Sequence, residues 1–350
     1  MKEDNNLCVL IMAGGKGTRF WPKSTEEKPK QFLKLIGNET MLQLTVARSL
    51  KITTMDKIFV ITGEMYKELV KEQLPELPEK NIITEPTGRN TAPCILLASL
   101  YIKQMYKDSN IVVLPSDHIV KDIDNFKYTV KKANDYITNQ NKEAIITIGI
   151  TPTRPETGYG YIKYNEKKYK EIVKVEKFVE KPDMETAKEY LKQGKYLWNA
   201  GMFIFNVDYM LEELKNNCEK TYKILSNLPK IDEQNYMKEL RETYKNCESI
   251  SIDYAVMEKS KNIYVIPSEL GWDDIGTWKC LERYIEHDDN GNVAIGDTYT
   301  ENSKNNVIYA ENKKVVLLDV EDLFCIDSNG VLIIGKKDRL AEAHNYRNII

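Results

Sequence analysis

Short apolar runs separated by helical patterns fill the first 150 residues of the chain. The runs have the length and continuous hydrophobicity of buried strands, and they cover residues 7–12, 57–62, 81–85, 110–114 and 144–149. After Thr91, apolar residues recur at helical spacing through Ile95, Ile102 and Met105, while Lys103 falls off that stripe. The alternation of strand and helix predicts a parallel sheet covered by helices on both faces.

The pattern changes after residue 150. "GYGYIKY" and "VKVEKFVEK" are typical of antiparallel ribbons, and a helix is expected from about Asp183 to Lys192, ending at Gly194. We expect this half to extend the same sheet. Beyond about residue 288, "NNVIYA", "KKVVLLDV" and "GVLIIG" alternate with turn residues and predict a separate small β module. The predicted fold class is therefore α/β, with a Rossmann-like, mixed and mostly parallel sheet over 1–288 and a small C-terminal β domain over 289–350.

Composition narrows the classes of partner. The 350 residues are 42% hydrophobic, and 50 basic against 53 acidic residues give a formal charge of -3, which excludes a global basic field for nucleic acid. The six cysteines form no CxxC pair, as expected of reduced thiols. No apolar stretch has the length of a membrane span, and "MKEDNN" is too acidic for a signal peptide, so we expect a cytoplasmic protein.

A glycine-rich loop, "AGGKGTRF", follows the first apolar run. Backbone amides freed by Gly14, Gly15 and Gly17 can point at an anion, and Arg19 can add charge. The loop lacks the Lys-Ser/Thr pair of a Walker loop, and Phe20 occupies the third glycine position of the dinucleotide fingerprint. It indicates a different kind of phosphate loop. The alternative is a tight turn between strand and helix that binds no ligand.

A longer stretch, "GGKGTRFWPKSTEEKPKQF", adds Lys30 to this run of donors and suits a triphosphate. It resembles the signature of sugar-nucleotide pyrophosphorylases, which join a nucleoside triphosphate to a sugar 1-phosphate and release pyrophosphate. With "EPTGRNTAP", "LPSDH", "FVEKP", "WNAGMF" and "GWDDIGTW", it is similar to the short, single-function bacterial type of mannose-1-phosphate guanylyltransferase. The resemblance implies transfer of GMP from GTP to α-D-mannose 1-phosphate with Mg²⁺, a β-helix-like C-terminal module, and a homodimer.

Two aspartates are the metal ligands that the resemblance implies. Asp117 follows an apolar strand, where a carboxylate suits a hard cation, although an isolated aspartate there is more often a cap or a turn residue. In "GWDDIGTW" adjacent side chains point to opposite sides, and the family pattern assigns the metal to Asp274. Asp273 is left as a solvated or capping carboxylate with a possible secondary role. His118 is expected to be structural, because the attacking sugar phosphate oxygen is already an anion.

The sugar site follows from the resemblance. It implies that Glu180 accepts hydrogen bonds from sugar hydroxyls, that Lys181 binds the sugar phosphate, and that Gly158 and Asn199 line the pocket. An amide donates to and accepts from hydroxyls, and a glycine lets backbone approach the ring. As an isolated pair, Glu180 and Lys181 read as a surface ion pair.

The base is expected to be selected by "EPTGRNTAP". Guanine presents two adjacent donors that one carboxylate accepts together, so Glu85 is the candidate, whereas an amide suits uracil or thymine. Asn90 and Thr91 contact the nucleotide or cap the following helix, and Arg89 is left open between a phosphate contact and a salt bridge. The nucleotide-binding set is Gly14, Gly15, Gly17, Thr18, Glu85, Asn90, Thr91 and Ser116.

The expected chemistry is an in-line displacement at the α-phosphorus. Arg19 and Lys30 would hold the triphosphate, Lys181 the attacking phosphate, and Asp117 and Asp274 the magnesium ion. One alternative keeps the reaction with another sugar or base, and another is a catalytically silent subunit that senses a sugar nucleotide. A nicotinamide dehydrogenase is disfavoured by Phe20.

Overall fold

A computed structural model describes residues 6–165, 171–347 and 349. Contacts divide the chain into two units. Unit 1 contains the residues up to Gly14 together with Thr45–Ser116 and Val120–Trp272, and unit 2 contains Gly15–Leu44, Asp117–Ile119 and the residues from Asp273 onward.

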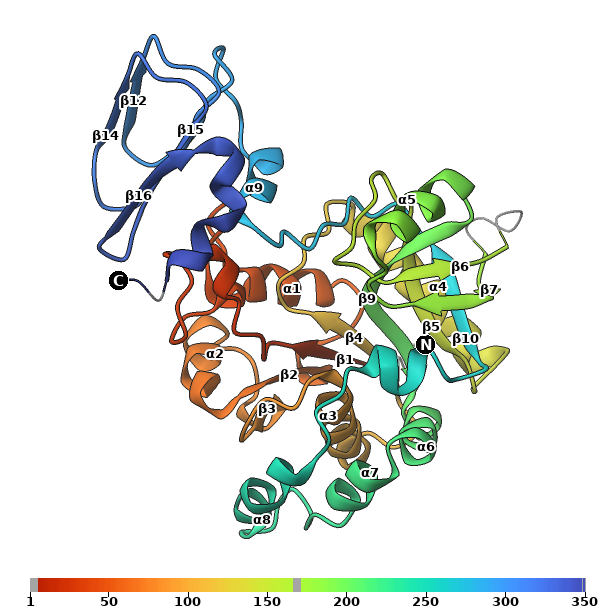
Figure 1. Ribbon diagram of the computed structural model, residues 1–350. Coiled ribbons are helices and arrows are strands. Elements are labelled where there is room, and N and C mark those ends of the chain that lie inside the picture. The colour runs from red at the N-terminus through yellow and green to blue at the C-terminus, as the bar shows by residue number, and fades with distance from the viewer. Residues whose placement is uncertain (1–5, 166–170, 348, 350) are drawn as a thin grey trace. The chain divides into compact units, whose positions relative to one another are not determined.

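Unit 1 is built on one ten-stranded mixed sheet (Figure 1). Its main path runs β3-β2-β1-β4-β9-β5-β10-β7. The strands are β1 Leu7–Met12, β2 Ile58–Gly63, β3 Ile82–Glu85, β4 Asn110–Pro115, β5 Ile145–Ile150, β6 Tyr161–Lys163, β7 Val173–Lys174, β8 Lys177–Val179, β9 Tyr196–Asn206 and β10 Ile263–Pro267. The first four strands are parallel to one another, β9 is antiparallel to β4 and β5, and β10 is parallel to β5. The predicted mixed, mostly parallel sheet is confirmed, including the antiparallel ribbon of β6 and β8.

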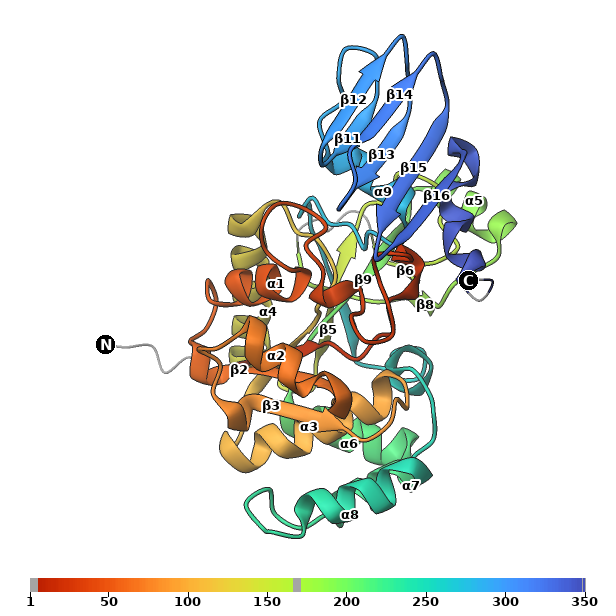
Figure 2. The same cartoon turned by 90° about the vertical axis from the view of Figure 1, so that its left-hand side faces the viewer.

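Helices cover both faces of this sheet. The helices of unit 1 are α2 Lys67–Gln73, α3 Thr91–Met105, α4 Ile123–Asn139, α5 Met184–Gln193, α6 Val207–Asn217, α7 Glu219–Ser226 and α8 Tyr236–Thr243. Figures 1 and 2 show α3, α6 and α7 together on one face, with α4 on the other. Because both faces are covered, β1 is buried along its length and reads as a continuous apolar run rather than an alternating one.

The helix expected from Thr91 is confirmed as α3. The apolar residues whose helical spacing predicted it lie on its buried side. Ile95, Ala98 and Ile102 are fully buried in the largest apolar cluster of the unit. The second expected helix, α5, is also present and ends at Gly194, whose φ of 65° closes it. No helix in the described ranges is long and apolar enough to cross a membrane.

Unit 2 contains two small, mostly parallel sheets formed by the described C-terminal residues (Figure 2). Strands β11 Val293–Ile295, β13 Val307–Ala310 and β15 Leu323–Ser328 pair in parallel, β16 Val331–Lys336 is antiparallel to β15, and β12 Thr298–Glu301 pairs in parallel with β14 Val315–Leu318. Strands repeated in parallel register are typical of a β-helix, which confirms the small β-helix-like module.

The core of unit 2 joins this module to earlier segments of the chain. Phe20 and Leu33 lie in one apolar cluster with Trp278, Phe324 and Ile326. Residues of this cluster lie on or next to four short helices, which are η1 Thr18–Phe20, η2 Lys30–Phe32, α9 Trp278–Leu281 and η10 Lys337–Tyr346. Helix α1 Met41–Ser49 begins in unit 2 and runs into unit 1. The expected domain boundary at residue 288 stays a prediction.

Candidate functional site

The glycine loop of unit 2 is folded directly onto helix η2. Gly17 has a φ of 52°, and a Cβ added to it would lie 2.5 Å from the backbone nitrogen of Lys30. Only glycine fits both the left-handed backbone and this close approach. The amide of Gln31 donates to the carbonyl of Gly15 over 2.9 Å. The "PKQF" segment therefore fixes the conformation of the loop.

Lys30 joins the two segments that carry the candidate metal ligands. Its side chain is almost fully buried, and Nζ lies 2.9 Å from Oδ2 of Asp117. The same ammonium donates to the backbone carbonyl of Asp274. Burial raises the pKa of Asp117, but the charges of Lys30 and His118 and the lysine hydrogen bond outweigh it, so the pKa lies below its usual value. Asp117 is therefore an ionised carboxylate at neutral pH.

A backbone pairing brings Asp117 and Asp274 into one place. The amide of Ile119 donates to the carbonyl of Asp273 over 2.8 Å, and the amide of Asp273 donates back over 3.1 Å. Arg19 reaches the same region, since a Cβ on Gly276 would lie 3.4 Å from Oδ2 of Asp274 and 3.6 Å from Nη1 of Arg19. The structure thus gathers four of the five predicted catalytic residues, Arg19, Lys30, Asp117 and Asp274, in unit 2.

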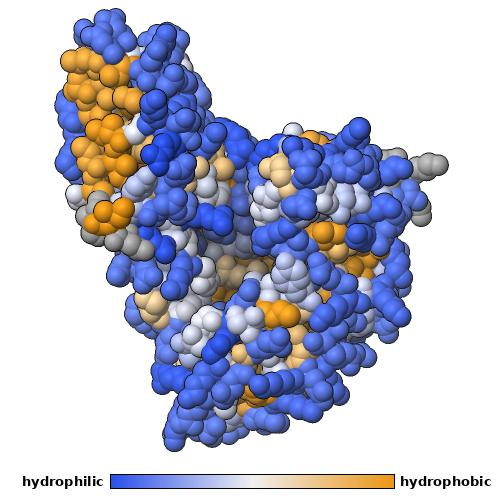
Figure 3. All heavy atoms as spheres, in the orientation of Figure 1, coloured by the Kyte–Doolittle hydropathy of each residue, from blue (hydrophilic) through white to orange (hydrophobic). Residues whose placement is uncertain are grey.

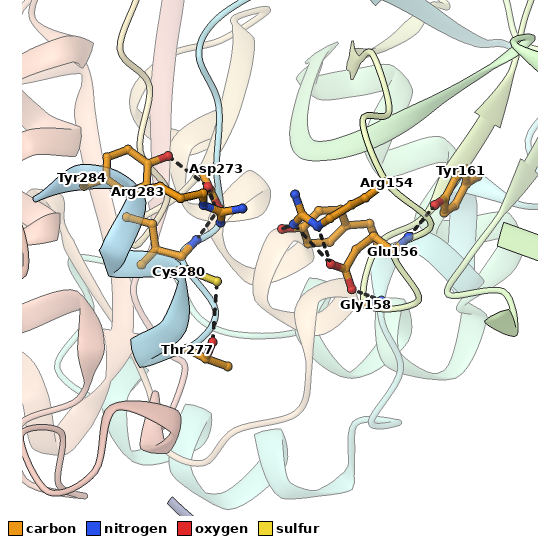
Figure 4. Close-up of polar contacts among 11 residues, drawn as sticks. Arg154, Glu156, Gly158, Tyr161, Asp273, Thr277, Cys280, Arg283 and Tyr284 are labelled. Carbon is orange, nitrogen blue, oxygen red and sulfur yellow. Dashed lines mark hydrogen bonds and ion pairs between the residues drawn. The ribbon is translucent and has the colours of Figure 1, made fainter. Parts of the chain in front are cut away.

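Asp273 shapes the turn that presents Asp274. It is 8% exposed, so the solvated alternative is wrong. Its Oδ1 accepts from the backbone of Ile275 over 3.0 Å, while Oδ2 accepts from the Tyr284 hydroxyl over 3.0 Å and lies 2.6 Å from Nη2 of Arg283 (Figure 4). Ile275 has a φ of 40°, which is strained for a β-branched residue. The carboxylate of Asp273 therefore holds a strained turn next to Asp274.

The oxygen donors of unit 2 fit a hard divalent cation. Asp117 and Asp274 supply carboxylates, the ligands that Mg²⁺ prefers. Within the described ranges no group of three or more His, Cys, Asp or Glu side chains forms a complete metal site. Two carboxylates suit an ion whose remaining ligands are phosphate oxygens and water.

In unit 1, the candidate base reader Glu85 is buried at the end of β3. Burial raises its pKa to about 7, against the opposing effect of hydrogen bonds from Tyr244 and Cys94. The Tyr244 hydroxyl donates to Oε1, and a Cβ on Gly14 would lie 3.3 Å from Oε2. The second carboxylate oxygen therefore faces a glycine, which leaves it room.

The residues after Glu85 begin helix α3. Asn90 has a φ of 65°, and its Oδ1 accepts from the amide of Thr91 over 2.8 Å, so its capping role is confirmed. The Thr91 hydroxyl accepts from the amide of Ile252 over 2.8 Å. Arg89 donates to the backbone carbonyl of Lys245. In this structure Arg89 therefore anchors a backbone segment, and the phosphate contact and the salt bridge considered for it stay predictions.

The remaining nucleotide candidates lie at strand and helix ends. The amide of Ser116, directly after β4, donates to the carbonyl of Met12 over 3.1 Å, and its own carbonyl accepts from the Thr45 hydroxyl over 3.2 Å. Thr18 begins η1 in unit 2. Nucleotide binding by Gly14, Gly15, Gly17, Thr18, Asn90, Thr91 and Ser116 stays a prediction.

The predicted sugar residues cluster in unit 1 around Glu180. Lys181 has a φ of 46°, and its Nζ lies 2.7 Å from Oε1 of Glu180. Burial lowers the pKa of Lys181, but Glu180 and Asp253 raise it above its usual value, so the ammonium is charged. A Cβ on Gly160 would lie 2.6 Å from Oε2 of Glu180 and 3.4 Å from Cβ of Asn199.

Asn199 is held by a hydrogen-bond network. Its Oδ1 accepts from the Thr147 hydroxyl over 2.8 Å and from the amide of Gly201 over 3.1 Å. Its Nδ2 donates to Oδ1 of Asp253 over 3.1 Å. The amide is therefore fixed in orientation before any ligand arrives.

Two residues of this cluster escaped the sequence analysis. Asp253 begins a π-helical turn, Asp253–Met257, and burial together with the charge of Glu180 raises its pKa to about 7. Its signal in the sequence was an acid directly after the buried Ile252. The second is Gly160, which packs closely against the carboxylate of Glu180. The Gly158 amide donates to Oε1 of Glu156 over 3.1 Å (Figure 4), and sugar binding by Gly158, Glu180 and Asn199 stays a prediction.

Known proteins that are similar to this chain in sequence and in fold are nucleotidyltransferases. Residues 8–291 match the family model described as nucleotidyl transferase. A mannose-1-phosphate guanylyltransferase of Escherichia coli is 37% identical over 98% of this chain and 75% of its own length. A protein of the same name from Salmonella montevideo is 39% identical over 94% of this chain and 70% of its own length.

Solved structures show the same architecture. The crystal structure of a protein named mannose-1-phosphate geranyltransferase, from Thermus thermophilus, covers 98% of this chain and 99% of its own, with a TM-score of 0.85 and 29% identity. A putative glucose-1-phosphate thymidylyltransferase from Bacillus anthracis, at 19% identity and a TM-score of 0.51, is similar in fold. Transferases of this kind generally use a divalent metal ion.

Proposed function

This chain belongs to the nucleotidyl transferase family, and from that premise we propose that it transfers GMP from GTP to α-D-mannose 1-phosphate, giving GDP-mannose and pyrophosphate. The substrates are those named for relatives that match it at 37–39% identity. The observation that carries the proposal is the Lys30 ammonium, held 2.9 Å from Asp117 and bonded to the backbone of Asp274. This buried cation contacts both segments that carry the candidate metal ligands, and phosphoryl transfer depends on such positioned charges.

In the proposed reaction, an oxygen of mannose 1-phosphate attacks the α-phosphorus of GTP. The bond from that phosphorus to the bridging oxygen breaks in line, and pyrophosphate leaves with the bonding electrons. The attacking oxygen is ionised at neutral pH, so the step needs no general base and no covalent enzyme intermediate. Catalysis then consists of positioning and charge neutralisation.

Each charged residue has one task in this scheme. Arg19 and Lys30 bind the triphosphate, and Lys181 binds the attacking phosphate. Asp117 and Asp274 are the ligands for Mg²⁺, which when bound neutralises charge on the phosphoryl oxygens. Lys30 is ordered by Asp117 before substrate arrives, so little side-chain entropy is lost on binding.

Glu180 and Asn199 are the proposed sugar contacts, and Glu85 the proposed guanine contact. The buried carboxylate of Glu85 supports guanine, because its two oxygens accept from the two adjacent N–H donors of that base. Asn90, Thr91 and the glycine loop supply the other nucleotide contacts.

The test is pyrophosphate release with Mg²⁺, crossing five nucleoside triphosphates against mannose and glucose 1-phosphates. We expect strong turnover only with GTP and mannose 1-phosphate. Asp274→Asn should lose about a hundredfold to a thousandfold in kcat, whereas Asp289→Asn, an exposed acid in the same unit, should match the parent protein. Turnover with another pair of nucleotide and sugar phosphate would keep the reaction type and show that GTP and mannose 1-phosphate are not the substrates. Nucleotide binding without turnover would instead favour a sensing subunit.

We also propose a homodimer in the cytoplasm. Apolar side chains gather on the outer face of the C-terminal sheets (Figure 3). Val316 and Leu318 of β14 and Leu332 and Ile334 of β16 are each about half exposed, and such a patch is typical of an interface. Light scattering should give twice the chain mass for the parent protein and the chain mass for Ile334→Asp. A monomeric parent protein would refute the dimer.

A further inference from the structure

Glu85 is held by a residue from a distant part of the chain. Tyr244, on the short helix η7 Tyr244–Asn246, is fully buried and donates its hydroxyl to Oε1 of Glu85. The Cys94 thiol from α3 also hydrogen-bonds this carboxylate. Oε2 faces Gly14. The Tyr244 and Cys94 donors therefore restrain the carboxylate, and Oε2 lies toward Gly14.

The turn that carries Tyr244 is anchored by the same loop that carries Glu85. Arg89 lies four residues after Glu85 and donates to the backbone carbonyl of Lys245, next to Tyr244. Further along, the amide of Ile252 donates to the Thr91 hydroxyl, and the amide of Ala92 donates to the carbonyl of Ile250 over 3.1 Å. The loop and the Tyr244 segment thus hold each other through Arg89, Thr91 and Ala92.

We propose that Tyr244 is a specificity-determining positioning residue, which orients Glu85 for two-point recognition of guanine, with Arg89 holding Tyr244 in place. The inference rests on the proposed function of Glu85. A rigid carboxylate accepts from both N–H groups of guanine at once, whereas a carboxylate that rotates loses one of the two bonds.

Charge matters because a protonated Glu85 presents the wrong pattern. A neutral carboxyl group offers one donor and one acceptor, which resembles an amide and opposes one of the two guanine donors. Burial raises the pKa of Glu85 to about 7, and the Tyr244 and Cys94 hydrogen bonds act against this rise. Cys247 faces Tyr244, and burial and Glu85 raise the pKa of the Tyr244 hydroxyl, so it remains a donor. Guanine binding should therefore weaken as the pH falls through about 7.

The experiment compares GTP with ITP, whose base lacks the 2-amino donor, by calorimetric binding and by kcat/KM from pH 6 to 8, a range in which both bases keep their ring N–H. In the parent protein we expect GTP to bind more tightly than ITP, with the preference growing as the pH rises through 7. Tyr244→Phe keeps the ring and removes the donor. It should lose about 10- to 100-fold in affinity for GTP at pH 7, with a smaller loss for ITP and partial recovery by pH 8.

Three further variants separate the possible failures. Tyr236→Phe removes another buried hydroxyl of unit 1 and should keep the parent preference and pH profile. Arg89→Lys should shift both in the same direction as Tyr244→Phe. Glu85→Gln should abolish the preference for GTP over ITP.

The outcomes are distinguishable. Should Tyr244→Phe retain the parent preference and pH profile while Glu85→Gln loses them, the inference about Tyr244 is wrong and the base reader stands. Should Glu85→Gln keep the preference, both the role of Glu85 and the inference fail. A parent protein that binds GTP with this preference but transfers no GMP would refute the proposed reaction and leave the inference intact, because the binding data do not depend on turnover.

Discussion

The strained turn after Asp273 provides a sharp test of how the candidate metal ligand Asp274 is held. Asp273→Ala removes the acceptor for the amide of Ile275, the acceptor for the Tyr284 hydroxyl and the ion pair with Arg283. The isosteric change Asp273→Asn keeps an oxygen that can accept from Ile275 and removes the charge. The pair of variants therefore separates the turn from the ion pair.

The expected loss of stability follows from these contacts. Each of the two hydrogen bonds to the buried carboxylate is worth about 1.5–3 kcal/mol. The ion pair adds under about 1 kcal/mol, because Arg283 is 43% exposed and screened by water. Asp273→Ala should therefore reduce the free energy of unfolding by about 3–6 kcal/mol, and Asp273→Asn by roughly a third to a half of that. Arg283→Ala should cost under about 1 kcal/mol.

Activity should respond through geometry. Without its acceptor, Ile275 is free to leave the left-handed region, and relief of such strain is worth about 1–3 kcal/mol. The neighbouring Asp274 then moves, and a displacement of about 1 Å costs on the order of a hundredfold in turnover. Urea unfolding at pH 7.5 and pyrophosphate release are measured on the same preparations. If Asp273→Ala unfolds and turns over like the parent protein, the turn does not depend on this carboxylate.

Local periodicity accounts for how much of the fold is predictable. Strand β1 was predicted with its observed ends, and α3 from its first residue, because burial of successive or evenly spaced side chains leaves a direct trace in the sequence. The glycines and charged residues of the candidate site were recognisable because they directly follow these apolar runs. Their placement at carboxyl ends is a rule of parallel sheets.

Partners distant in the chain leave no such trace. Tyr244 lies 159 positions from Glu85, and Asp253 lies 54 positions from Asn199. Neither pairing follows from spacing, since it arises only when helices pack on the sheet. The left-handed conformation of Ile275 was equally hidden, because isoleucine rarely adopts it and only the bond from Asp273 makes it tolerable. The sequence therefore predicted which residue types matter, but not which neighbours orient them.

Three further predictions test the loop and the two charged clusters. Gly17→Ala should lower the unfolding temperature, because its Cβ would lie 2.5 Å from the Lys30 backbone nitrogen and Gly17 has a φ of 52°. Gly15→Ala should not, because a Cβ there has open space around it. Calorimetry measures both unfolding temperatures. Lys30→Met should lose about a hundredfold to a thousandfold in kcat, since it removes the proposed phosphate-binding cation and the largest influence that opposes burial in setting the pKa of Asp117. Exposed Lys28→Met is its control. Asp253 has a pKa raised from 3.8 to about 7, so between these values the folded protein binds more protons than the unfolded chain, and stability falls as the pH rises. Asp253→Asn keeps an acceptor for Asn199 and does not ionise. Its free energy of unfolding in urea, relative to that of the parent protein, should therefore increase from pH 4 to pH 7. A difference that stays constant over this range would show that this carboxyl group titrates normally.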